Sequence, residues 1–226
     1  MNGKVDRCKR VAIFIMFGHI ESSSSVINFI KSLSIKGYIV DIFSLDRFKD
    51  IFNQEYKNIN FYSDRDFDTG AKHKTLKQIF GYNLINCFFL KLYRSVKLHG
   101  IKTGIFYAIF IVRYLKLALY LSDISKKIKN RSYICFIGVE KLGLFVADLV
   151  NCNEVPLIYY SLELDYTTPP GIRRFTFDAY RGLEIIAHHN AIATIIQDKE
   201  RAKLLFEYNK ISEDKQEIIY LPVSMR

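Results

Sequence analysis

Apolar residues along this chain gather in short continuous runs, and longer stretches with helical spacing separate the runs. The first run, residues 11–17, is rich in β-branched and aromatic residues and ends at a glycine, which is typical of a strand buried on both faces of a parallel sheet. Similar runs lie at residues 38–43, 59–62, 133–137, 157–160, 191–196 and 217–221. The pattern therefore predicts about seven strands.

Helical spacing fills the segments between these runs. Serines at 22–25 can cap a helix that carries Val26, Ile30 and Leu33 on one side. Further helices are predicted over residues 142–151, 173–189 and 199–209, and over most of 75–130. Strands that alternate with helices along the whole length, with no linker between them, predict one α/β domain. We expect a Rossmann-like open parallel sheet with helices on both faces.

Ligands of such a sheet bind beyond the carboxyl ends of its strands, which directs attention to four connections. The first connection contains Gly18, His19, Glu21 and Ser22, and it leads into a helix N-terminus. Backbone N–H groups and the helix dipole favour a phosphate or another anion there, so Gly18, His19 and Ser22 are candidate anion ligands. Glu21, in the same connection, is a candidate for binding the hydroxyls of an acceptor substrate. The alternative is a plain turn with serine caps in which His19 is a bystander.

Two more connections each carry one acidic candidate. Glu140 follows the run 133–137, and a carboxylate at a strand end can accept hydrogen bonds from sugar hydroxyls. Its alternative role is an ordinary charge at a helix N-terminus, which stabilises by under about 1 kcal/mol. Asp198 follows the run 191–196, and the simplest interpretation is an N-cap with Arg201 on the first turn.

The connection after the run 157–160 is the richest in polar residues. Glu163 and Asp165 lie just beyond the run, and Arg173 and Arg174 begin the next helix. Paired arginines can bind a phosphate bidentately, and carboxylates can orient hydroxyls. Surface carboxylates and solvated arginines are the alternatives.

The net charge of +10 comes from one internal segment. Residues 71–131 contain 13 Lys or Arg and a single acid, Asp123, and aromatic residues are interleaved with them. Basic amphipathic helices bind anionic membrane surfaces, and each well-placed charge contributes roughly 1 kcal/mol. We expect a basic helical insertion that attaches the protein peripherally to the inner face of a membrane, with a solvated helix packed on the sheet as the alternative. Nucleic acid is not an expected partner, because no RNA- or DNA-reading motif accompanies the charge.

Other chemistry is disfavoured by the sequence. The four cysteines have no metal-ligand spacing, which predicts reduced thiols, a cytoplasmic location and no metal site. His188 and His189 lie near a helix C-terminus, where positive charge is mildly stabilising. No apolar stretch approaches the roughly 20 residues of a spanning helix. A nucleotide or NAD enzyme is a weaker alternative, because the first run lacks GxGxxG and Asp41 falls inside the second run.

The C-terminal part of the chain carries a resemblance. It reads Tyr-Arg-Gly-Leu-Glu at 180–184, Ala-Ile-Ala-Thr-Ile-Ile-Gln-Asp at 191–198 and Ile-Ile-Tyr-Leu-Pro-Val at 218–223. This helix–strand–helix–strand–Pro pattern resembles the end of the N-terminal domain of a GT-B glycosyltransferase of the family 4 type, and the layout of residues 11–45 and 133–164 is similar. The resemblance implies the acceptor-binding half of an enzyme that transfers sugar from a nucleotide-sugar to a glycan or lipid-linked acceptor.

The resemblance also implies roles for single residues. Glu163 would be the acceptor-side catalytic carboxylate that orients or deprotonates a hydroxyl, Gly18 would lie in the loop beside the donor pyrophosphate, and Asp198 would border the cleft. In that family a second domain binds the donor, without a cofactor or metal in most members. We expect the chain to need a donor-binding domain or partner chain and to have little transfer activity alone. The alternative is a non-catalytic, membrane-docking subunit of a two-chain glycosyltransferase.

Overall fold

The computed structural model describes residues 9–16, 23–45, 56–63, 115–152, 154–162 and 172–221, and for 115–120, 122 and 172–180 it describes the backbone alone. The elements in chain order are β1 (Arg10–Ile15), α1 (Ser24–Ile35), β2 (Ile39–Ser44), β3 (Ile59–Tyr62), α4 (Leu115–Lys129), β4 (Cys135–Val139), α5 (Glu140–Val150), β5 (Leu157–Tyr160), α6 (Ile172–His189), β6 (Ala193–Ile196), α7 (Lys199–Asn209), the 3-10 turn η2 (Glu213–Lys215) and β7 (Glu217–Tyr220).

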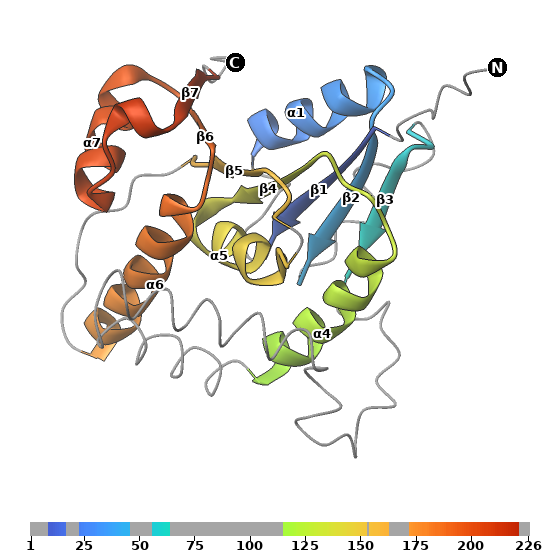
Figure 1. Ribbon diagram of the computed structural model, residues 1–226, viewed down its shortest axis with the longest axis horizontal. Helices are drawn as coiled ribbons and strands as arrows, with labels where there is room; N and C mark the ends of the chain where they lie inside the picture. The colour runs from blue at the N-terminus through green and yellow to red at the C-terminus, as the bar shows by residue number, and fades with distance from the viewer. Residues whose placement is uncertain are drawn as a thin grey trace.

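The seven strands form a single sheet in the order β3-β2-β1-β4-β5-β6-β7, and every neighbouring pair is parallel (Figure 1). This confirms the predicted α/β fold with a Rossmann-like open sheet. The chain builds outward from β1 through β2 to β3, and then returns to the other side of β1 to build β4 to β7. The direction of strand order therefore reverses between β1 and β4, where Val11 is paired with Cys135.

Helices cover both faces of the sheet, as predicted (Figure 1). On one face α1 buries Val26 and Ile30 against the side chains of β1 and β2. On the other face α4, α5, α6 and α7 contribute to one larger apolar cluster, for example through Ile124, Phe145 and Phe206. The sequence prediction of a loop at 138–141 was wrong, because β4 continues to Val139 and α5 begins at once.

The larger cluster centres on three phenylalanines from neighbouring strands. The ring of Phe14 stacks on Phe43 with centroids 5.2 Å apart and meets the edge of Phe136 at 5.4 Å. All three side chains are at most 1% exposed, and burying a phenylalanine side chain stabilises a fold by about 1.5–3 kcal/mol. The centre of the sheet is thus fixed by β1, β2 and β4 together.

Two glycines allow α5 to lie directly on the sheet. A Cβ atom at Gly143 would overlap the carbonyl oxygen of Phe14 in β1, and one at Gly138 would overlap the backbone of Leu144. Any larger residue would push α5 away from the strands on either side of the reversal of strand order. The carboxyl ends of β1 and β4 are therefore held against the first turns of α5.

One buried carboxylate joins the first three strands to the segment before β4. The Asp41 cluster consists of Arg10, Asp41, Asn60, Tyr62, Arg131 and Tyr133. Asp41 is fully buried in β2 and accepts bonds from Arg10 Nη1 at 2.8 and 2.9 Å and from Arg131 Nη1 at 2.7 Å. Burial pushes the pKa of Asp41 upward, but the bonds from Tyr133, Arg10, Asn60 and Arg131 outweigh it and hold the pKa below its usual value. Asp41 is thus committed to structure.

A second buried polar group joins the last strands. In the His188 network (His188, Thr194, Asn209 and Gln216), Asn209 Nδ2 donates to His188 Nδ1 at 2.9 Å, so His188 Nε2 carries the proton and donates to Thr194 Oγ1 at 2.8 Å. Thr194 Oγ1 donates onward to Gln216 Oε1 at 2.9 Å. Burial lowers the pKa of His188 to about 3. His188 lies near a helix C-terminus, as expected, but it is a neutral core residue.

Candidate functional site

The candidate site is the edge of the sheet at which β1, β4, β5 and β6 end. β1 and β4 are the neighbours between which strand order reverses, and open α/β sheets hold their ligands just beyond the carboxyl ends of such strands. Polar side chains follow β4, β5 and β6 directly, at Glu140, Ser161 and Gln197. The described part of this edge is therefore built from four separate segments of the chain.

Glu140 has an unusual backbone for a glutamate. It is the first residue of α5, and its φ of 59° lies in the left-handed region. A non-glycine residue in that conformation costs about 1–2 kcal/mol, which is retained only where the surroundings require it. The conformation turns the chain from β4 into α5 without a loop, and it directs the side chain toward the end of β5.

The carboxylate of Glu140 is bonded to the protein. Its Oε1 accepts the backbone N–H of Leu162 at 2.5 Å. The backbone carbonyl of Leu162 accepts hydrogen bonds from Gln197 Nε2 at 3.0 Å and from Arg201 Nη1 at 2.9 Å. Leu162 is thus held on both peptide groups by side chains from the ends of β4 and β6 and from α7, so the chain leaves β5 in a fixed direction.

Asp198 caps α7. Its Oδ1 accepts the backbone N–H of Arg201 at 2.8 Å, and its Oδ2 lies 3.5 Å from Arg201 Nε. The N-cap interpretation is thereby confirmed. An acceptor-binding role for Asp198 and for Glu140 stays a prediction, although both lie at the predicted edge.

Behind this edge lies a buried acid that the sequence analysis did not single out. Glu184 in α6 is 1% exposed, accepts the Tyr159 hydroxyl at 2.7 Å, and has its other oxygen 3.9 Å from Lys141 Nζ. Burial raises the pKa of Glu184, and the opposing effects of Lys141 and Tyr159 are smaller. The sequence offered one indication that this glutamate faces inward: it follows Leu183 and precedes Ala187 by about one helical turn, and both of those residues are buried.

The remaining predicted residues are described in part or not at all. Arg173 and Arg174 lie in the first turn of α6, where the structure describes only the backbone. Gly18, His19, Glu21, Ser22, Glu163 and Asp165 lie outside the described residues. Their roles stay predictions from the sequence.

Two further observations concern metals and membranes. No three His, Cys, Asp or Glu side chains gather as a metal site within the described residues, and burial raises the pKa of Cys135 to about 11, so its thiol stays protonated. None of the helices in the described part of the chain combines the length and the apolar content needed to cross a bilayer.

Comparison of the sequence with protein-family models gives no match, and comparison with curated proteins gives no significant match. A function for this chain is therefore inferred from its own residues and their geometry.

Proposed function

We propose that this chain is the acceptor-binding domain of a GT-B glycosyltransferase that uses a nucleotide-sugar donor. The observation that carries the proposal is the construction of the carboxyl edge, where Glu140 keeps a costly left-handed backbone and bonds the end of β5. Binding sites tolerate strain of this kind because it fixes groups in place. The helix–strand–helix–strand–Pro pattern of residues 180–223 supports the choice of this enzyme class.

The chemistry of the proposed reaction is an exchange at the anomeric carbon. The oxygen of an acceptor hydroxyl forms the new glycosidic bond, its proton passes to a carboxylate, and the bond to the nucleoside diphosphate breaks with the electron pair leaving on phosphate. Glu163, directly after the held residue Leu162, is the proposed proton acceptor. Most of the rate enhancement comes from positioning and from stabilisation of the leaving charge, which a donor-binding domain or partner chain supplies.

The proposal is tested by ligand binding at the carboxyl edge. We expect saturation-transfer NMR to detect binding of a panel of octyl glycosides, and Glu140→Ala to weaken it. Glu154→Ala is the matched control, because Glu154 also has a positive φ (52°) and is exposed away from the edge. Stabilisation by NAD in a thermal-shift assay, with no glycoside binding, would instead support the dinucleotide alternative.

A second test concerns activity. The purified chain is expected to turn over no nucleotide-sugar by itself, and to gain transfer activity when a donor-binding chain or domain is added. Rapid turnover of any nucleotide-sugar by residues 1–226 alone would show that the division of roles is wrong.

We further propose peripheral attachment to an anionic membrane surface at the inner face of a membrane. The supporting observation is the basic character of residues 71–131, which includes Lys126, Lys127 and Lys129 in the last turn of α4. Flotation with liposomes that contain anionic lipid should recover the protein, and recovery should fall at high salt. Equal recovery with neutral lipid would remove the electrostatic argument.

A further inference from the structure

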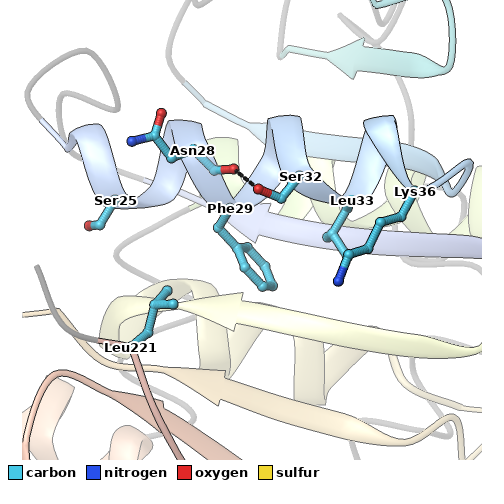
Figure 2. A pocket seen from close by; sticks show the side chains of 7 residues that line it. All are labelled: Ser25, Asn28, Phe29, Ser32, Leu33, Lys36 and Leu221. Carbon is cyan, nitrogen blue, oxygen red and sulfur yellow. Dashed lines mark hydrogen bonds between the residues drawn. The ribbon is translucent and has the colours of Figure 1, made fainter. Parts of the chain in front are cut away.

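A groove of about 410 Å³ lies between α1 and the residue that follows β7. Its wall on the α1 side includes Ser25, Phe29, Ser32, Leu33 and Lys36, and Leu221 faces them from the opposite side (Figure 2). These positions recur at helical spacing, so the groove follows much of the roughly 18 Å length of this 12-residue helix. Its volume is within the range of about 300–1,000 Å³ that is usual for pockets of small ligands.

The floor of the groove is apolar. Phe29 points from α1 into the groove and meets the buried ring of Tyr160 edge-on, with centroids 5.4 Å apart (Figure 2). Phe29, Leu33 and Leu221 are each only partly buried against the core cluster on this face of the sheet. Apolar side chains in a hollow of this size fit a ligand that is apolar along most of its length.

The charge of the groove has one sign. α1 contains Lys31 and no acidic residue, its C-cap is Lys36, and among the described residues Lys36 is the one ionisable member of the lining. Figure 2 shows the ammonium of Lys36 directed into the groove beside Leu33. Hydroxyls occur on the α1 side, where Ser32 Oγ donates to the carbonyl of Asn28 at 2.7 Å and keeps its lone pairs available. An apolar body with an anionic group beside Lys36 matches this distribution.

We propose that the groove binds an anionic amphiphile, with a single alkyl chain along Phe29, Leu33 and Leu221 and its phosphate beside Lys36. A free sugar or nucleotide would leave the apolar floor uncovered, and the described lining offers no acidic side chain to receive its hydroxyls. The lining of the groove shares no residue with the contacts among Glu140, Leu162 and Arg201, although Leu221 and Leu162 pack against the same apolar cluster. It therefore does not depend on the proposed sugar transfer.

The experiment is titration calorimetry with dodecyl phosphate below its critical micelle concentration. We expect one molecule to bind per chain. Lys36→Glu should weaken binding about tenfold, which corresponds to roughly 1.4 kcal/mol. Ser32→Trp, a substitution at an exposed position of the lining, should abolish binding by filling the groove.

Lys31→Glu is the matched control, because it makes the same charge change on the same helix outside the groove, where Lys31 lies over the ring of Tyr56. It should leave the affinity within about twofold. Inorganic phosphate should not compete with dodecyl phosphate, because the alkyl chain of the ligand supplies most of the binding free energy. No binding of dodecyl phosphate by the unsubstituted protein, or equal losses in Lys31→Glu and Lys36→Glu, would overturn the proposal.

A last arm identifies the source of the amphiphile. Flotation of the unsubstituted protein and Ser32→Trp with anionic vesicles is done at high salt, which screens the attachment proposed for residues 71–131, and it then shows whether the groove draws a lipid from a membrane. Loss of flotation in Ser32→Trp supports a membrane lipid, and retained flotation with lost dodecyl phosphate binding supports a soluble amphiphile in the same groove. The variants Lys36→Glu, Ser32→Trp and Lys31→Glu are first compared with the unsubstituted protein by circular dichroism and thermal melting.

Discussion

Each half of the sheet contains its own network of buried polar groups, and the two networks differ in charge. In the half formed by β1 to β3, the Asp41 cluster is ionic, with two guanidinium groups on one carboxylate. In the half formed by β5 to β7, the His188 network is neutral, and each member donates to the next. The first cluster depends on a charge that persists to low pH, whereas the second depends on the absence of charge.

This difference teaches that burial alone does not decide protonation. Asp41 and His188 are both 0% exposed, yet Asp41 stays ionised and His188 stays neutral. Asp41 is compensated by Arg10 and Arg131, whereas His188 contacts only uncharged side chains through its ring nitrogens. Partners therefore decide which form survives in the core.

The largest expected effect is that of Asp41→Ala. It leaves Arg10 and Arg131 part-buried without their carboxylate, which should lower the free energy of unfolding by about 3 kcal/mol. Urea denaturation measures this change. Asp123→Ala is the control, because it removes a more exposed ion pair with Lys126 and should cost at most about 0.5 kcal/mol. Equal losses would mean that the Asp41 cluster contributes no more than a surface pair.

The next effect is that of His188→Leu, which removes a donor and an acceptor from the other half. Thr194 and Asn209 each lose their bond to His188, while Thr194 keeps its bond to Gln216, and we expect a loss of about 2 kcal/mol in the same assay. His189→Leu changes the neighbouring, exposed histidine and should cost less than about 1 kcal/mol. If the two variants were equally stable, the His188 network would not be the element that holds this half.

The two halves should respond differently to acidification, because His188 and Asp41 lose their contributions to stability over different pH ranges. The unfolded His188 takes up a proton near pH 6.5, but the folded residue does so only near pH 3, so stability is complete above about pH 6.5 and falls as the pH drops toward 3. The slope from this residue is up to about 1.4 kcal/mol for each pH unit. The pKa of folded Asp41 is lowered, so its contribution is complete above the ordinary aspartate pKa of 3.8 and is lost as the pH falls from there toward the lowered folded value. Denaturation at pH 7 and pH 5 should show a smaller difference in His188→Gln, and an unchanged difference would contradict the assignment.

The smallest effect concerns Glu140, which lies between the halves. Glu140→Gly relieves the left-handed backbone but removes the bond to Leu162, so we expect a net loss of about 1 kcal/mol. Glu154→Gly relieves the same kind of backbone without losing a comparable bond, but glycine also gains entropy in the unfolded chain, so stability should change by no more than about 0.5 kcal/mol. Thermal melting of both variants makes the comparison, and matching shifts would argue against a clamp on Leu162.

The strands were predictable because each is an uninterrupted apolar run. All seven predicted strands are present, since strands covered on both faces need no polar alternation. The order in which they pair was not readable, because Val11 and Cys135 meet only through the return of the chain past the basic segment. The left-handed turn at Glu140 was also missed, since it depends on a bond to Leu162 far along the chain.

The polar residues of the core were harder to predict than the candidate site. Asp41 could be placed inside a strand but not connected to Arg131, because their contact is made between distant segments. His188 and Glu184 are polar residues at inward-facing positions of α6, and in the sequence only the apolar residues around them indicate that they are buried. By contrast, Glu140 and Asp198 were found at the expected strand ends, because that edge follows from the parallel fold itself.

The pairing of β1 with β4 has a consequence for how the chain varies in length. Val11 and Cys135 close a loop that contains β2, β3 and the whole basic segment, and the entropy of closing so long a loop depends only weakly on its size. Doubling it would cost only about 0.6 kcal/mol. Lengthening the connection between Tyr62 and α4 therefore adds little to the entropy cost of closing this loop, whereas a single added carbon at Gly143 collides with β1. The fold therefore tolerates added length in this loop far better than added side-chain volume between α5 and the sheet.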